Sequence, residues 1–283
     1  MTFETLYWTN RNDDAHPTEL QVSAEHGAVL RVEANAEGSS PQSVGLFRSS
    51  PPASELARLW DIVSTAAFQS ERNASDILPG EVVRRITVRI PGQPDVERIA
   101  SEGGPDPRGF VDAERILVHL AELARAQPQY ATAIALGTPA AALDRAGGTV
   151  SLSVNVRNVG TTPLALPGPV SWVAEKVTFT VFVLRSDLPT AQLRNEHQRI
   201  LELEPEDVEV ARPSGGGTRR ERLYLEPGSS LQLHLSHRVG DLPRGKYDAW
   251  AEIALPIREA DGSLVLRCLM RSTHVHLSGV LEP

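Results

Sequence analysis

The sequence predicts two parts of different fold class, an α+β N-terminal domain and an all-β C-terminal sandwich. Helical stripes of apolar residues occur before residue 128, whereas short alternating strands separated by turns follow from residue 149 onward. The length of 283 residues also exceeds that of most single domains. We therefore expect domains at 1–128 and 149–283, joined by an Ala- and Gly-rich linker at 129–148.

The N-terminal domain is expected to follow the order strand, strand, helix, strand, strand, helix (ββαββα). Alternating apolar residues predict hairpins over 19–34 and 82–99. Apolar residues at helical spacing follow each hairpin, in a first helix with Ser54 as a candidate N-cap and a second helix over 112–126. Because each helix has a single apolar stripe, the simplest packing places both helices on one face of a small sheet.

The C-terminal domain is expected to contain short strands and no helices, which is the pattern of a β-sandwich. Residues 132–136 of the linker also fit a strand. The expected strands lie at 150–156, 177–184, 222–225, 231–235, 246–254 and 264–277.

Composition and charge exclude some classes of partner. Hydrophobic residues make up 41% and charged residues 23% of the chain, which is typical of a globular protein, and 21 Gly and 21 Pro indicate many turns. The formal net charge is −8 and the arginines are scattered, whereas binding to nucleic acid requires clustered cations. We therefore expect no nucleic-acid partner.

The chain has no segment that approaches the length of a membrane span, and its start lacks the basic and apolar regions of a signal peptide. Its single cysteine, Cys268, excludes an intramolecular disulfide and lies in an apolar run, where a buried inert thiol is favoured over a nucleophile. These features predict a cytoplasmic protein with no membrane partner.

Three turn motifs stand out in the C-terminal domain. One strand ends on Asn158-Val159-Gly160, a later strand follows Pro227-Gly228-Ser229, and the segment 242–247 has the form Leu-Pro-x-Gly-x-Tyr. The glycines permit turn dihedrals with positive φ, and Tyr247 can place its hydroxyl near a corner backbone group. This pattern resembles bacterial immunoglobulin-like domains, and specifies a fold more than a function.

Among families with such a domain, the intracellular proteinase inhibitors of the BsuPI type resemble this pattern. The N-terminal order, with Gly45-Leu46-Phe47 ahead of the first helix, is similar to that of emfourin-like inhibitors of metalloproteases. Both resemblances imply a protein partner, possible inhibition of a protease, and no cofactor. The chain has no Gly-Gly-Phe-Ala-Gly motif and carries a long insertion, so no inhibitory residue is transferred from these families.

Histidines near the C-terminus give the one pattern that suggests a metal, as His234-x-x-His237 and His274-x-His276. The neighbouring apolar residues alternate against His234, His274 and His276, which places these three side chains outward. The two pairs are expected in opposite sheets, and so on opposite sides of the sandwich. We therefore expect surface histidines and no metal site.

Two further patterns have less specific interpretations. The acidic run 202–209 lacks the spacing of a calcium loop and fits a solvated face. The glycine-rich stretch 214–218 lacks the Gly-Lys-Ser/Thr of a phosphate loop and fits a flexible tip. No Gly-x-Ser-x-Gly elbow occurs, and no catalytic residues are identified.

The insertion at 185–222 is the most informative feature for function, because a loop of this length in a compact domain is usually functional or disordered. It either packs on its own domain as a partly helical segment or becomes ordered on a partner. Arg and Tyr are the residues that interfaces favour. The candidate interaction residues are Arg194, His197, Arg219, Arg220, Arg222 and Tyr224.

The sequence as a whole predicts a non-enzymatic protein-binding protein without a cofactor, either an inhibitor or a subunit of an assembly. Two alternatives stay open. One is a metal-dependent enzyme built on the C-terminal histidines, and the other is a small-ligand sensor with the N-terminal domain as the binding part.

Overall fold

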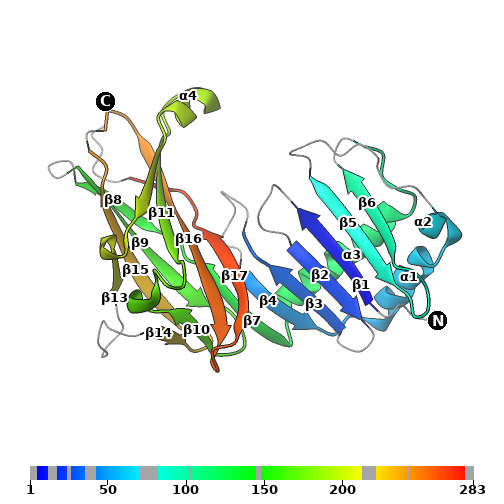
Figure 1. The fold of residues 1–283 in the computed structure, drawn as a ribbon. Coiled ribbons are helices and arrows are strands. Elements are labelled where there is room, and N and C mark those ends of the chain that lie inside the picture. Colours follow the sequence, from blue (N-terminus) through cyan, green and yellow to red (C-terminus); the bar gives the residue numbers. More distant parts are fainter. Residues whose placement is uncertain are drawn as a thin grey trace. The chain divides into compact units, whose positions relative to one another are not determined.

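The computed structural model describes residues 5–11, 18–23, 27–35, 43–70, 82–101, 104–144, 148–211, 221–240 and 242–277. The described chain is built mostly of β-strands (Figure 1). Neighbouring strands such as β1 and β2, β11 and β16, and β9 and β15 pair in antiparallel orientation. It divides into two compact units. The first comprises Met1–Glu33 and Leu46–Ala131, and the second comprises Ala34–Gly45 and Thr132–Pro283.

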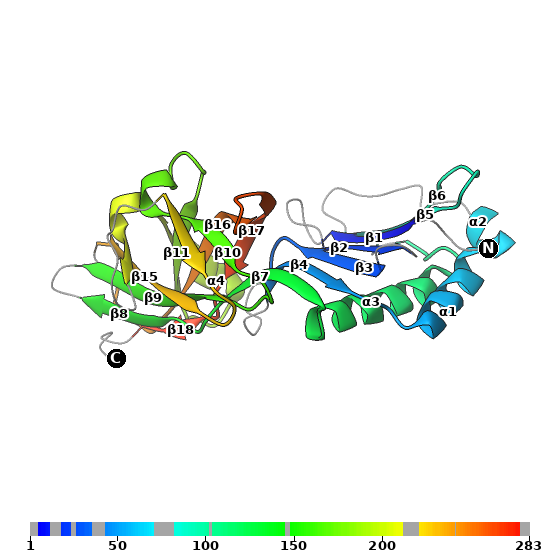
Figure 2. The same ribbon diagram turned by 90° about the horizontal axis from the view of Figure 1, so that it is seen from below.

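The first unit contains a sheet with the strand order β4-β3-β2-β1-β5-β6. Its strands are β1 (Thr5–Arg11), β2 (Thr18–Ser23), β3 (Gly27–Val32), β4 (Val44–Ser49), β5 (Val83–Arg89) and β6 (Val96–Ser101). The helices α1 (Ala53–Val63) and α2 (Ala66–Ser70) follow β4, and the helix α3 (Phe110–Ala126) follows β6. Figure 2 shows α1 and α3 on one face of this sheet.

Burial explains why both helices lie on that face. The α3 stripe is completely or nearly buried, with Leu117, Leu120 and Ala124 at 0–1% exposure. Alternate residues of β1, including Leu6 and Trp8, are buried as well, so the helices and the sheet share one apolar core.

A polar contact fixes α3 to the sheet. Glu114 of α3 accepts a hydrogen bond from the Trp8 indole, with 3.3 Å between Nε1 and Oε1, and forms an ion pair of 2.6 Å with Arg84 of β5. Arg84 also pairs with Asp106 at 2.6 Å. The arginine is therefore satisfied by two carboxylates, and its partly buried position costs less free energy than it would without them.

The predicted order ββαββα is incomplete, because the observed order of this unit is ββββααββα. No strand was predicted at β1. Its apolar residues Leu6 and Trp8 face the helices, and Thr5, Tyr7 and Thr9 occupy the opposite face. The strand β4 includes Gly45-Leu46-Phe47, for which no strand was predicted. The first helix begins at Ala53 with Pro52 as its N-cap residue, so Ser54 does not cap it.

The second unit contains two sheets (Figure 1). In one sheet, β13 (Val208–Ala211) pairs with β15 (Ser230–Arg238), which pairs with β9 (Thr149–Asn158); β9 also pairs with β7 (Tyr130–Leu136) and β8 (Ala140–Asp144). In the other, β16 (Tyr247–Glu259) pairs with β11 (Thr178–Arg185), β10 (Leu164–Pro167), β17 (Leu264–Arg271) and β18 (Val275–His276); β12 (Arg199–Leu203) pairs with β11, and β14 (Arg222–Leu225) with β10.

Alternation along the strands builds the core of this unit. On β9, Val150, Leu152, Val154 and Val156 are at 0–1% exposure, whereas the residues between them are exposed or half-buried. β11 repeats the pattern with Phe179, Val181 and Val183 among its inward residues. Cys268 is buried on β17 at 2% exposure, as the sequence predicted.

The linker predicted at 129–148 is wrong for the described residues. Residues 130–136 form β7, as the alternative interpretation expected, and residues 140–144 form β8. Alanine is a poor strand former, but the side chains of Ala131 and Ala133 are buried, and β8 pairs with β9 along its whole length. The strand predicted over 264–277 is interrupted, because residues 272–274 separate β17 from β18.

The edge of β17 is closed by a side chain from a distant segment of the same unit. Asn35 donates from Nδ2 to the Arg271 carbonyl at 2.7 Å and accepts from the Arg271 N–H at 2.7 Å. Its amide group thus imitates the backbone of a neighbouring strand. Ala34 adds a single parallel bridge to Leu269. Edge strands left open are prone to unwanted pairing, so this contact protects the sheet.

The Asn-x-Gly motif works through the asparagine side chain. Asn158 is completely buried; its Nδ2 donates to the carbonyls of Thr162 and Leu225 at 2.9 and 2.8 Å, and its Oδ1 accepts from the Gly160 N–H at 2.9 Å. Gly160 does not adopt a positive φ, whereas Gly228 does, at 79°. The sequence prediction about turn dihedrals is therefore correct for Gly228 and wrong for Gly160.

Tyr247 occupies the corner that the Leu-Pro-x-Gly-x-Tyr motif predicted. Its ring is 2% exposed and its hydroxyl donates to the Pro243 carbonyl at 3.0 Å. A tyrosine that returns to the backbone a few residues upstream fixes the entry to the following strand, which here is β16.

Replacement of Asn158 by alanine tests the importance of the buried amide. Asn158→Ala leaves two carbonyls and one N–H of the turn without their partner, and each buried unsatisfied group costs roughly 1–3 kcal/mol. We expect a large loss in the free energy of unfolding, measured by urea denaturation. Asn155→Ala on the exposed face of the same strand is the control and should change it little. Equal effects of the two substitutions would contradict the assignment.

Candidate functional site

The insertion at 185–222 is built into both sheets of the second unit and is not a single loop. Its described part contains α4 (Ala191–Glu196), β12, the 3₁₀ turn η2 (Pro205–Asp207) and β13. β12 pairs with β11 and β13 pairs with β15, so the chain crosses from one sheet to the other between them. Of the two alternatives, packing on its own unit as a partly helical segment is the one observed.

The crossing at η2 is held by an acidic side chain. Asp207 accepts from the Glu204 N–H at 3.2 Å, and its Oδ2 also lies 2.8 Å from Nδ1 of His237 on β15. The acidic run therefore includes a structural residue that connects the turn to the sheet. Glu206 and Glu209, on either side, have no ion pair within the described residues.

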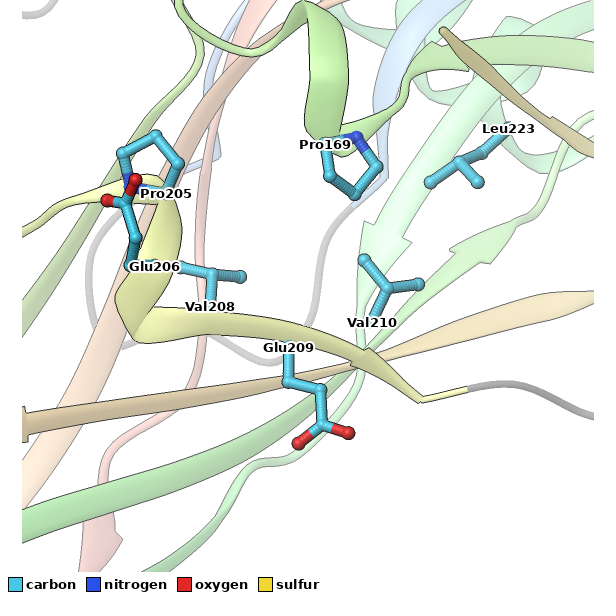
Figure 3. A pocket seen from close by; sticks show the side chains of 7 residues that line it. All are labelled: Pro169, Pro205, Glu206, Val208, Glu209, Val210 and Leu223. Atoms are coloured by element: carbon cyan, nitrogen blue, oxygen red, sulfur yellow. The ribbon is translucent and has the colours of Figure 1, made fainter. Parts of the chain in front are cut away.

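An apolar groove lies beside this crossing, between β13 and β14. Its volume is about 380 Å³. Figure 3 shows Val208 and Val210 on the side of β13 that faces Pro169 and Leu223, and Glu209 on the opposite side. The lining residues are Pro169, Pro205, Glu206, Val208, Glu209, Val210 and Leu223.

Both strands that flank the groove have an unpaired edge among the described strands. β13 pairs with β15 alone and β14 pairs with β10 alone, and each ends its sheet. Unpaired edges present backbone N–H and C=O groups that can bind a further strand. The groove thus combines an apolar surface with available backbone hydrogen-bonding groups.

Two predicted interaction residues flank the groove on β14. Arg222 and Tyr224 belong to this strand, and the Tyr224 side chain is 56% exposed. The guanidinium of Arg222 lies against the turn at Gly262, in the space that the Cβ of any other residue at 262 would occupy. Arg219 and Arg220 lie outside the described residues.

The remaining two predicted residues lie elsewhere. Arg194 is in α4 and His197 directly follows it, and α4 packs on β11. The strand β16 connects the two places. The end of β11 from which the chain continues to α4 pairs with Tyr247, at the start of β16. The strand β10, which pairs with β14, lies against Arg258 near the other end of β16. Tyr247 and Arg258 are about 35 Å apart along the strand, at ~3.3 Å per residue. The structure therefore does not unite the four described residues of this set into one site.

The two pairs of C-terminal histidines belong to different sheets, as predicted. His234 and His237 lie on β15, whereas His276 lies on β18 and His274 just before it. His234 of β15 has Nδ1 2.6 Å from the Ser153 hydroxyl, and His237 pairs with Asp207. In the other sheet, His276 lies 3.1 Å from Asp248, and His274 stacks on Trp250 with 4.3 Å between ring centroids. No group of three possible metal ligands occurs in the part of the chain that the structure describes.

A local ion pair lies at the start of the insertion. Arg185 donates from Nε to Asp187 at 2.7 Å, and this hydrogen bond lowers the pKa of Asp187 and raises that of Arg185. Both side chains are partly exposed, at 22% for Arg185 and 30% for Asp187. A carboxylate with a lowered pKa remains ionised at neutral pH, which suits a structural ion pair and not an acid catalyst.

A second hollow, of about 260 Å³, lies on the sheet of the first unit. It includes Arg31, whose Nε is buried and has no hydrogen-bond acceptor among the described residues. No sequence pattern signals this hollow, because its residues come from four different strands. They are Tyr7, Trp8, Thr9, Glu19, Gln21, Val29, Arg31 and Leu46.

Comparisons with known proteins do not assign the chain to a family. No protein-family model and no curated protein matches it. Among solved structures, it is similar to the apo PmoF2 PCuAC domain at a TM-score of 0.27 and 16% identity, over 54% of this chain and 98% of that one. It is also similar to AvmM, which catalyses macrocyclisation in alchivemycin A biosynthesis, at a TM-score of 0.26 and 16% identity, over 53% and 91%.

None of the helices in the described residues combines the length and the apolar character needed to cross a membrane.

Substitution of Asp207 tests whether the crossing depends on its carboxylate. Asp207→Asn weakens two hydrogen bonds, each worth about 0.5–1.5 kcal/mol, so the free energy of unfolding should fall. A double-mutant cycle with His237→Gln should give a coupling energy between the two side chains. Glu206→Gln, at the next position, is the matched control and should be neutral. If the control destabilises the protein as much as Asp207→Asn, the connection is unimportant.

Proposed function

We propose that this chain is a non-enzymatic protein-binding protein whose second unit is an immunoglobulin-like sandwich. The groove between β13 and β14 receives an extended segment of a partner protein. The observation that carries the proposal is the apolar lining, Pro169, Val208, Val210 and Leu223, placed between two strand edges that have no partner among the described strands.

An extended segment suits this site for two reasons. Its backbone can pair with an unpaired strand edge, and its alternate side chains can enter the apolar groove. Full burial of a Val- or Leu-sized side chain contributes roughly 1.5–3 kcal/mol, and part of this is offset by the cost of ordering the segment. A small apolar groove of this kind is therefore suited to a reversible interaction.

The immunoglobulin-like assignment is supported by two features of the second unit. Two antiparallel sheets share a core of alternating apolar residues, and Tyr247 forms the corner contact with Pro243. The resemblance to BsuPI-type inhibitors is compatible with a protease as the partner. A subunit of a larger assembly would use the same groove.

Paired substitutions at the groove test the proposal. The tagged chain and its Val210→Ser variant are used to capture proteins from a lysate of the source organism, with Ile200→Ser as the control on β12. Ile200 is 59% exposed and does not line the groove. We expect a stoichiometric partner whose recovery falls several-fold with Val210→Ser alone, while thermal unfolding shows that the variant is folded. Equal recovery with all three chains would refute a role for the groove.

A second candidate function is the binding of a small anionic molecule in the hollow of the first unit, because the buried Nε of Arg31 has no acceptor among the described residues, while its Nη2 pairs with Glu33 at 2.6 Å. The Trp8 indole lies on the other face of β1, where it donates to Glu114, so binding is followed by calorimetry. Titration with citrate and with inorganic phosphate should give a saturable heat of binding that Arg31→Gln abolishes. A flat titration with both anions argues against this function.

The metal-dependent alternative is tested separately by metal analysis of the purified chain. A stoichiometric transition metal would support the enzyme built on the C-terminal histidines and would contradict their assignment as surface residues without a metal. A metal-free, partner-binding chain would support the protein-binding proposal.

A further inference from the structure

We infer that the groove selects a partner segment in which apolar and basic residues alternate, and that this segment adds to the free edge of β13. The inference rests on the proposed function and goes beyond it, because it specifies the chemistry of the partner and the strand that receives it. It follows from the two faces that β13 presents and from the charges beside it.

The alternation follows from the pleat of β13. Val208 and Val210 point toward the groove, and Glu209 points to the opposite side (Figure 3). A strand added beside β13 continues the same pleat, so its alternate residues face the groove and the others lie beside Glu209. Apolar side chains suit the first set, and cations suit the second.

The two glutamates that line the groove are available for such cations. Glu206 and Glu209 form no ion pair within the described residues, whereas their neighbour Asp207 is occupied by His237 and the backbone of Glu204. On β15, the residue opposite Glu209 is His234, whose Nδ1 is already hydrogen-bonded to Ser153. Two carboxylates thus flank the groove without a described counter-ion.

The edge of β14 is less suited to the same segment. Its residues that point away from the groove are Arg222, whose guanidinium lies against Gly262, and Tyr224. The strand β14 therefore offers no carboxylate to a cation on an added strand. The charge pattern therefore favours β13 as the receiving strand.

The test uses three synthetic eight-residue peptides with a fluorescent label, one alternating valine and lysine, one alternating valine and glutamate, and one alternating valine and serine. Binding to the full chain is measured by fluorescence anisotropy at low and high salt. We expect the lysine peptide to bind about tenfold more tightly than the glutamate peptide at low salt, with a smaller difference at high salt. The serine peptide should lie between them.

Substitutions locate the charge selection. Glu209→Gln should reduce the preference for the lysine peptide several-fold, and Glu206→Gln should act in the same direction. Glu202→Gln on β12 removes the same charge outside the groove and should leave the preference unchanged. If Glu202→Gln has the same effect as Glu209→Gln, the preference reflects the net charge of the chain, and the inference is overturned.

Backbone pairing is tested with the lysine peptide after N-methylation of alternate amides. A methyl group on the amides that face β13 should abolish binding, whereas methylation of the other set should have little effect. Equal loss with both sets would argue against strand addition.

The outcomes separate this inference from the proposed function. If all three peptides bind equally and compete with the captured partner, the groove binds extended segments without charge selection, so the inference is wrong and the function stands. If no peptide binds while Val210→Ser still releases the partner, the inference is again overturned and the groove retains its role. If Val210→Ser releases nothing and no peptide binds, both fail.

Discussion

The second unit depends on the buried side chain of Asn158, because this one amide connects its two sheets. Asn158 ends β9 of one sheet, and its Nδ2 donates to the carbonyl of Leu225 at the end of β14 in the other. The backbone of Asn158 adds two hydrogen bonds to the following turn, to Ser229 and from Gly228. Since β14 forms one side of the groove, the position of that side is set by this residue.

The other side of the groove is set by a different polar contact. Asp207 connects the turn before β13 to His237 of β15, so β13 enters its sheet at a fixed position. The groove is therefore the space between two strands that are each fixed at one end by a buried or half-buried polar side chain. Its apolar lining is exposed because neither edge acquires another described strand.

Strong alternation made part of the fold predictable from sequence. β9 and β15 have strict apolar alternation over their length, and both were located correctly, as was α3 from its apolar stripe. Of the short strands, β14 was located correctly at 222–225, whereas β8, β10 and β13 were not found. β10 is Leu-Ala-Leu-Pro and is buried on both faces, so it has no alternation to detect.

The candidate site was predictable only in part. The sequence pointed to the insertion and to Arg222 and Tyr224, which do lie on a strand beside the groove. It missed the groove itself, because Pro169, Val210 and Leu223 come from three separate segments and share no motif. The strands β12 and β13 each overlap an end of the acidic run 202–209, which suggested a solvated face, and their strand conformation comes from pairing with β11 and β15.

Hydrogen exchange of the chain with and without its captured partner tests the central claim most directly. The account predicts slower exchange of backbone amides in β13, residues 208–211, when the partner is bound, because a strand added at that edge would accept hydrogen bonds from them. Unchanged exchange in β13 and β14, together with protection at another surface, would contradict the claim that the groove is the binding site.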